Sequence, residues 1–86
     1  MQIGQTKNFE KQFRKLPSDI RKKIIKQIEF ITQDFFHPSL NTKRHGFGED
    51  WWEFRIDKHY RMAGKKLDDQ LILHIVGMHD VGLGKK

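Results

Sequence analysis

The sequence predicts an α+β fold in which an N-terminal helix hairpin packs on one face of a small antiparallel β-sheet. Two observations lead to this expectation. Apolar residues recur with a helical period as far as Phe35, and the period changes to two from Trp51 onward. Helices that are grouped before the strands in this way typically pack together on one side of the sheet. No repeat, low-complexity tract or linker divides the 86 residues, so we expect a single domain that spans residues 1–86.

The first helix is predicted between Lys7 and Leu16. Phe9, Phe13 and Leu16 follow the i, i+4, i+7 spacing that places side chains on one helical face. Pro17 ends this helix, because proline disfavours helical geometry at the residue before it.

A second helix is predicted from Ser18, whose hydroxyl is expected to cap it, to about Phe35. Its apolar stripe consists of Ile20, Ile24, Ile28, Ile31 and Phe35. Because the connection to the first helix is short, we expect the two to form an antiparallel hairpin.

The remainder of the chain predicts strands. Residues 39–50 form a basic connection that contains glycine, and 51–57 alternate as a strand with one buried face. Residues 60–65 and 71–78 are further strands, and the last is apolar enough to lie inside the sheet. Residues 1–5 are a weaker candidate for a first strand. The buried face of 51–57 would carry Trp52, Phe54 and Ile56, and the other face Trp51, Glu53, Arg55 and Asp57.

Charge limits the classes of partner. Lysine and arginine number 17 against 11 acidic residues, which gives a formal net charge of +6. Such a charge favours polyanions, nucleic acid above all, although it also serves simple solubility. The chain contains no cysteine, which fits a reducing compartment. No stretch approaches the ~20 apolar residues of a membrane helix, so we expect a cytoplasmic protein without a membrane partner.

The sequence contains none of the common motifs for nucleotide binding, serine nucleophiles or metal binding. There is no phosphate-binding loop and no dinucleotide fingerprint, and neither Ser18 nor Ser39 stands in a nucleophile-elbow sequence. Histidines are frequent, but none has the spacing of a known metal-binding motif. We therefore expect no metal and no small-molecule cofactor.

The remaining basic and polar residues suit the cleavage or binding of RNA. RNA carries its own nucleophile, the 2′-hydroxyl, so cleavage needs only a base, cations for the phosphoryl oxygens and an acid for the leaving oxygen. Histidine and arginine can fill all three roles. The candidate catalytic residues are Arg61, His79, Arg55, His59 and His45, and the candidate RNA-binding residues are Lys43, Arg44, Lys58, Trp51 and Lys85.

The histidines also have structural interpretations. His79 can hydrogen-bond a loop carbonyl, and His59 can be a solvated turn residue. His74 lies in mid-strand and is expected to be a core histidine, whereas His45 is open to either interpretation.

The arginines and tryptophans have structural interpretations as well. Arg55 and Arg61 can pair with Glu53 or Asp57 across a hairpin. One of the two adjacent tryptophans belongs to the core, and the other is either a stacking platform for a base or half-buried at a sheet edge.

Five segments taken together carry a family resemblance: Phe9 to Leu16, His37-Pro38-Ser39-Leu40, Gly46 ahead of Trp52-Glu53-Phe54-Arg55-Ile56, His59-Tyr60-Arg61, and Ile75-Val76-Gly77-Met78-His79-Asp80. Their order and spacing resemble the RelE/ParE superfamily of bacterial toxin–antitoxin systems, over nearly the whole chain. The resemblance implies a RelE-like fold and an antitoxin that wraps the toxin. It also implies a toxin that cuts mRNA in the ribosomal A site or, in the ParE branch, inhibits DNA gyrase.

The resemblance further implies roles for single residues. Arg61 matches the arginine that stabilises the phosphate, and His79 matches a histidine of YafQ-like toxins that helps protonate the leaving group. His45 corresponds loosely to a loop histidine of the same toxins. The sequence departs from the family where RelE has catalytic lysines, near Trp51 and Glu53. It also lacks the usual terminal aromatic residue, since that stretch reads Val81-Gly82-Leu83.

The leading hypothesis is thus a ribosome-dependent, metal-independent mRNA endonuclease, the toxin of a toxin–antitoxin module. Its partners would be a cognate antitoxin, the ribosome and mRNA. The alternatives are a ParE-like inhibitor of DNA gyrase and a non-catalytic basic RNA-binding domain.

Overall fold

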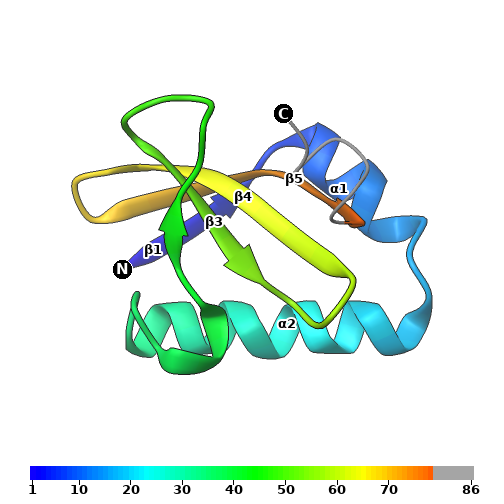
Figure 1. Ribbon diagram of the computed structural model, residues 1–86. Helices are drawn as coiled ribbons and strands as arrows, with labels where there is room; N and C mark the ends of the chain where they lie inside the picture. The colour runs from blue at the N-terminus through cyan, green and yellow to red at the C-terminus, as the bar shows by residue number, and fades with distance from the viewer. Residues whose placement is uncertain (79–86) are drawn as a thin grey trace.

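The computed structural model describes residues 1–78. His79, Lys85 and the stretch 81–83 lie outside the described residues, so the predictions that concern them stay predictions. In chain order the elements are β1 (Gln2–Gln5), α1 (Lys7–Arg14), α2 (Ser18–Gln33), the short 3-10 helix η1 (Pro38–Leu40), β2 (Lys43–Arg44), β3 (Trp51–Arg55), β4 (Tyr60–Leu67) and β5 (Gln70–Met78) (Figure 1).

The sheet has five strands in the order β1-β5-β4-β3-β2. Strands β3 to β5 form the expected antiparallel meander, and β5 lies inside the sheet. The two-residue strand β2 falls within the stretch 39–50 that was predicted as a connection, and it extends the sheet by pairing with β3. Strand β1 instead pairs with β5 in parallel, with Ile3 opposite Leu71. The α+β class is confirmed, but the sheet is mixed rather than antiparallel. A parallel pair needs a long crossover connection, and the helices and the meander supply one between β1 and β5.

The helices begin and end slightly differently from the prediction. Thr6 caps α1, because its hydroxyl oxygen accepts a hydrogen bond from the backbone N–H of Phe9. The expectation that Ser18 caps α2 was wrong. Pro17 occupies the cap position, and its carbonyl accepts from the backbone N–H groups of Ile20 and Arg21. Ser18 is therefore already the first helical residue.

Helix α2 lies along one face of the sheet, and α1 packs beside β5 (Figure 1). The core is built from one face of β3, β4 and β5 together with the inner stripe of the helices. The buried apolar residues of this core are Phe9, Ile20, Ile24, Ile31, Leu40, Phe54, Ile56, Met62, Leu71, Leu73 and Val76. The prediction that Phe54 and Ile56 face the core is confirmed, and Trp52 packs against the same cluster.

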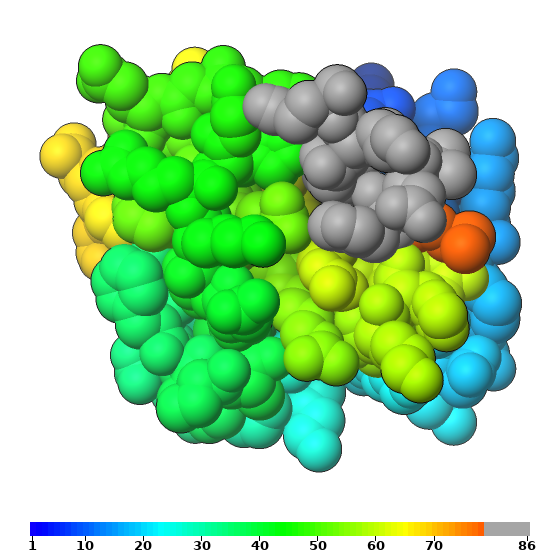
Figure 2. Space-filling view, viewed as in Figure 1, coloured from blue at the N-terminus to red at the C-terminus, as the bar shows by residue number. Residues whose placement is uncertain are grey.

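The other sheet face, which we call the open face, carries Trp51, Glu53 and Arg55 of β3. In Figure 2, the connection that holds β2 (green) and the β3–β4 hairpin (yellow-green) make up much of the surface turned toward the viewer. Within residues 1–78, neither helix is long and apolar enough to cross a membrane.

Candidate nucleic-acid interface on the open sheet face

Glu53 is the centre of a polar cluster on the open face. Its side chain is only 7% exposed, and one carboxylate oxygen, Oε2, lies 3.8 Å from Arg61 Nε and 4.0 Å from Lys43 Nζ. The other oxygen, Oε1, lies 3.9 Å from His45 Nε2. Strand pairing brings these groups together, because Lys43 pairs with Glu53 from β2 while Arg61 comes from β4. The cluster joins three residues predicted as functional with one that was considered only as an ion-pair partner.

Arg61 is held by more than the carboxylate. Its guanidinium donates hydrogen bonds to the backbone carbonyl oxygens of Tyr60, at 2.9 Å, and Asp57. The pairing of Arg61 with Glu53, one of the two interpretations of the sequence, is therefore present. These bonds place the guanidinium over the β3–β4 hairpin.

The hairpin turn is organised by Asp57. Its Oδ1 accepts hydrogen bonds from the backbone N–H groups of His59 and Tyr60, and its Oδ2 lies 3.1 Å from Lys23 Nζ. Burial alone would raise the pKa of Asp57, but the hydrogen bonds from His59, Lys23 and Tyr60 and the charge of Lys23 outweigh it and lower the pKa. Asp57 is thus ionised at neutral pH and fixes the turn.

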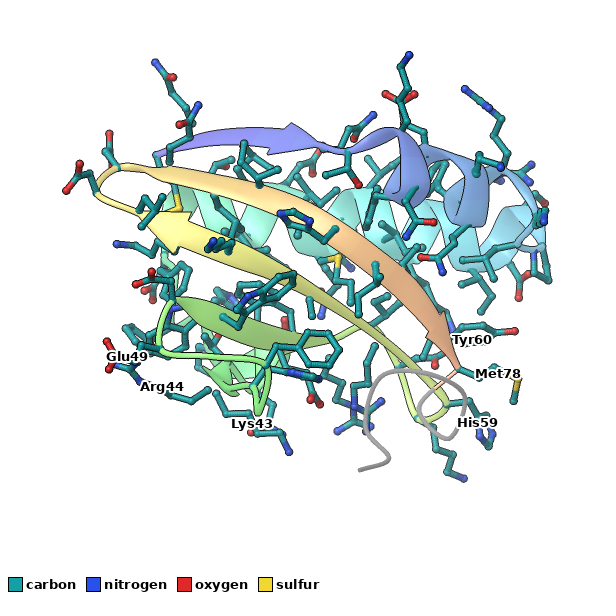
Figure 3. All side chains as sticks on the ribbon, turned by 90° about the horizontal axis from the view of Figure 1, so that it is seen from above. Lys43, Arg44, Glu49, His59, Tyr60 and Met78 are labelled. Atoms are coloured by element: carbon teal, nitrogen blue, oxygen red, sulfur yellow. The ribbon has the colours of Figure 1, made fainter. Side chains whose placement is uncertain are left out.

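The side chains of Lys58 and His59 project from this turn into solvent. Tyr60, the next residue, pairs with Met78 at the end of β5, and Figure 3 shows His59, Tyr60 and Met78 close together. The turn therefore brings the exposed His59 imidazole to the sheet end where the Arg61 guanidinium is held.

His45 is buried rather than exposed in its loop. Its side chain is 3% exposed, its Nδ1 accepts a hydrogen bond from the backbone N–H of Phe47, and its Nε2 faces Glu53. With both ring nitrogens directed at neighbours, His45 supports the loop and the Glu53 carboxylate.

The remaining cations occupy different positions. Arg55 is exposed and stands opposite Arg61 in the ladder, and its side chain makes no ion pair within residues 1–78. Lys43 is 56% exposed beside Glu53. Arg44 turns away to the sheet edge, where its guanidinium lies 4.8 Å from the centre of the Trp52 ring and donates to the Glu49 carbonyl.

The two tryptophans point to opposite faces, as predicted. Trp52 packs on the core side, whereas Trp51 lies half-buried on the open face between the rings of Phe47 and His74. The expectation of a core histidine at His74 was wrong. His74 is partly exposed, because the face of β5 that it shares with Trp51 is not covered by a helix.

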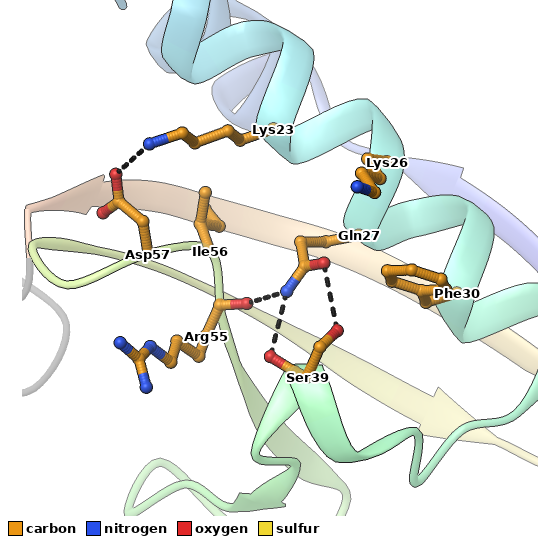
Figure 4. A pocket seen from close by; sticks show the side chains of 8 residues that line it. All are labelled: Lys23, Lys26, Gln27, Phe30, Ser39, Arg55, Ile56 and Asp57. Carbon is orange, nitrogen blue, oxygen red and sulfur yellow. Dashed lines mark hydrogen bonds and ion pairs between the residues drawn. The ribbon is translucent and has the colours of Figure 1, made fainter.

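A cleft of about 410 Å³ lies between α2 and the start of the hairpin (Figure 4). The buried amide of Gln27 donates to the carbonyl oxygens of Arg55, at 2.7 Å, and Ser39, at 3.1 Å. These bonds tie α2 to β3 and η1, so the cleft walls are fixed. The lining residues are Lys23, Lys26, Gln27, Phe30, Ser39, Arg55, Ile56 and Asp57.

Sequence reasoning did not single out Glu53 and Phe47 as site residues. The alternation of β3 already placed Glu53 on the open face. The sequence could not show that cations from β2 and β4 surround its carboxylate. Phe47 stands in a Gly-Phe-Gly loop, where no periodic pattern predicts the orientation of its side chain. Within residues 1–78, no group of three or more histidines and acidic residues is arranged to hold a metal ion.

The fold described above is the RelE-like α+β fold of toxins from toxin–antitoxin systems, so the resemblance predicted from the sequence is confirmed for the fold. A chain of the RelB–RelE antitoxin–toxin complex from Methanococcus jannaschii superposes with a TM-score of 0.75 at 22% identity, covering 90% of this chain and 91% of that one. The YoeB/ParE toxin from Agrobacterium tumefaciens gives 0.76 at 15% identity, with coverage of 92% and 99%.

A chain of the E. coli DinJ–YafQ complex gives a TM-score of 0.68 at 13% identity, covering 95% of this chain and 97% of that one. No family sequence model and no curated protein sequence matches the chain. At these identities the likeness to solved structures establishes the fold.

Proposed function

We propose that this chain is the toxin of a toxin–antitoxin pair and a metal-independent endoribonuclease that cuts mRNA on the ribosome. The fold supports the first part of this proposal. One observation carries the second part: the carbonyls of Asp57 and Tyr60 hold the Arg61 guanidinium at the same turn from which the exposed His59 side chain projects. Met78, which precedes His79 in the sequence, pairs there with Tyr60.

The cleavage step follows from these groups. The 2′-hydroxyl oxygen attacks the adjacent phosphorus, the bond to the 5′ oxygen breaks, and a 2′,3′-cyclic phosphate forms. Arg61, with Arg55 opposite it in the ladder, stabilises the charge on the phosphoryl oxygens. His79 protonates the leaving 5′ oxygen. His59 is the better base for the 2′-hydroxyl, because His45 is buried and its Nδ1 already accepts a hydrogen bond.

The partners follow from the same proposal. Similar folds were crystallised as complexes with the antitoxins RelB and DinJ, and the cations of the open face suit an acidic or amphipathic segment that folds on binding. The toxin would act in the cytoplasm, on ribosomes that carry mRNA.

Inducible expression in bacteria, with the 5′ ends of mRNA mapped after induction, tests the proposal. Wild-type protein should arrest growth and cut translated messages at fixed codon positions. Arg61→Ala and His79→Ala should each lower cleavage by about 100-fold or more. Arg14→Ala is a matched control, since Arg14 is an exposed arginine of α1. Equal cleavage by Arg61→Ala and wild-type protein would contradict the assignment of Arg61.

The Glu53 carboxylate favours a second candidate, a ParE-like inhibitor of DNA gyrase without nuclease activity. A negative charge within 4.0 Å of Arg61 and Lys43 stands where a scissile phosphate would approach. Growth arrest with intact mRNA and loss of DNA supercoiling would select this candidate. Salt-dependent RNA binding without cleavage or growth arrest would select the third, a non-catalytic RNA-binding domain.

A further inference from the structure

A row of aromatic rings crosses the open face beside the Glu53 cluster. The ring of Phe47 lies 4.2 Å from the ring of His45 and 5.1 Å from that of Trp51, and Trp51 lies 4.7 Å from His74. Phe47 is 53% exposed although it is one of the largest apolar side chains. Neither the core nor the proposed cleavage step uses these rings.

The loop that carries Phe47 is held in place rather than loose. The backbone N–H of His45 donates to the carbonyl of Trp51 at 3.0 Å, and the backbone N–H of Trp51 donates to that of Gly48 at 3.3 Å. The backbone N–H of Phe47 itself donates to His45 Nδ1. A Cβ at Gly48 would lie 3.3 Å from Trp51 Cδ1, so the glycine lets the loop lie close against that indole. The exposed phenyl ring is therefore preorganised, which lowers the entropic cost of binding.

The charges around the rings indicate which partner fits. Lys65 stands opposite Trp51 in the ladder and is exposed, and Lys43 is exposed beside His45. Trp51 and Glu53 lie two residues apart on the same face of β3, so the rings adjoin the Arg61 cluster. The Phe47 ring stands edge-to-face on Trp51, at 86° between the ring planes. An exposed ring flanked by cations suits single-stranded nucleic acid, because a base stacks on the ring face while phosphates follow the cations. A purely apolar protein segment would leave these lysines without a counterpart.

We propose that the exposed Phe47 ring, which Trp51 buttresses edge-to-face, is a stacking platform for an unpaired base of RNA, adjacent to the phosphate held by Arg61. The inference rests on the proposed function and extends it, since the platform would select the base next to the cleaved bond. The loop residue Phe47 supplies the exposed ring, and Trp51 supports it from the sheet.

The platform can be tested by binding alone, apart from cleavage. The chain has two tryptophans, so Trp52→Phe leaves Trp51 as the sole indole reporter. A short single-stranded oligoadenylate should quench its fluorescence, whereas inorganic polyphosphate, which carries charge without bases, should not. Phe47→Ala in this background should weaken oligoadenylate binding by about fivefold or more. Polyphosphate binding, measured by isothermal titration calorimetry, should be unchanged. Phe47→Tyr should restore the affinity.

Phe36 supplies the matched control. It is 61% exposed, but it contacts Phe35 and Trp52 at the core side rather than Trp51, so Phe36→Ala should bind oligoadenylate like its parent. Unchanged RNA binding by Phe47→Ala would overturn the proposal and leave the rings to a protein partner. An equal loss for polyphosphate would also overturn it. Ring-dependent RNA binding without mRNA cuts in cells would uphold the platform and reject the nuclease, so the two failures are distinguishable.

Discussion

Glu53 and Arg61 are diagonal neighbours in the β3–β4 ladder, and the carboxylate Oε2 lies 3.8 Å from the guanidinium Nε. Both side chains are largely buried, at 7% and 16% exposure. A buried ion pair is costly to break from one side, because the remaining charge loses its counterpart without regaining water. The same carboxylate also faces Lys43 and His45, so the open face depends on it for its arrangement.

Glu53→Ala should therefore lower the free energy of unfolding by about 3 kcal/mol, measured by urea denaturation. Glu49→Ala is the control, since Glu49 is exposed and only its backbone carbonyl is used; its effect should stay within ~0.5 kcal/mol. Equal stability of Glu53→Ala and wild-type protein would show that the cluster contributes nothing to folding.

Thr6 and Ser18 form a matched pair at the starts of the two helices. Thr6→Ala removes the hydroxyl that accepts from the Phe9 N–H, and should cost about 1 kcal/mol of stability. Ser18→Ala should change the stability by no more than ~0.5 kcal/mol, because the Ser18 side chain makes no capping bond. Thermal unfolding of both variants checks this, and a larger loss for Ser18→Ala would reverse the assignment of the caps.

Gly64 marks the irregularity in the β4–β5 ladder. A Cβ there would meet the Ile72 carbonyl oxygen at 2.5 Å and Leu73 Cα at 3.0 Å, and both are backbone atoms that cannot turn aside. Gly64→Ala should destabilise the fold by about 1–3 kcal/mol. At Gly4 the added Cβ meets only Ile72 Cδ1, the mobile end of a side chain. Gly4→Ala should cost less, and a greater loss at Gly4 in urea denaturation would contradict the geometry.

Asp57 should make the free energy of unfolding depend on pH in the acidic range. Its pKa is lowered in the folded protein from an ordinary value of 3.8, so its contribution is present above that pH and is lost as the pH falls through the folded pKa. Asp57→Asn removes the charge opposite Lys23, and should cost about 1 kcal/mol at pH 7. The difference from wild-type protein should shrink below about pH 4.

Urea denaturation at several pH values measures this dependence. Asp68→Asn is the control, because the Asp68 side chain makes no hydrogen bond or ion pair within residues 1–78. A stability difference for Asp57→Asn that is constant from neutral to acidic pH would contradict the lowered pKa.

The sequence predicted the local structure because side-chain periodicity is a local property. The stripe of Ile20, Ile24 and Ile31 predicted α2, and the alternation from Trp51 to Ile56 correctly separated the core face of β3 from its open face. The cap of α2 was missed because the helix begins one residue earlier, with Pro17 at the cap position and Ser18 inside the first turn; residue preference alone does not fix that boundary.

The candidate site was only partly predictable. Arg61 and His59 could be named from the sequence, because strand ends and turns place basic side chains at a surface. The direction of the Arg61 guanidinium depends on the carbonyls of Tyr60 and Asp57, and the burial of His45 depends on the loop that Phe47 closes. These contacts join groups whose spacing in the sequence follows neither the helical nor the strand period, so the sequence pattern does not predict them.

The sequence by itself thus determined the helices, the meander and the two faces of β3, since each follows from the order of polar and apolar residues along a short segment. Only the tertiary structure decided that β1 runs parallel to β5, that Glu53 gathers Lys43, His45 and Arg61, and that Phe47 remains exposed on a fixed loop. These features depend on contacts between distant segments, and such contacts form only when the whole chain packs around one core.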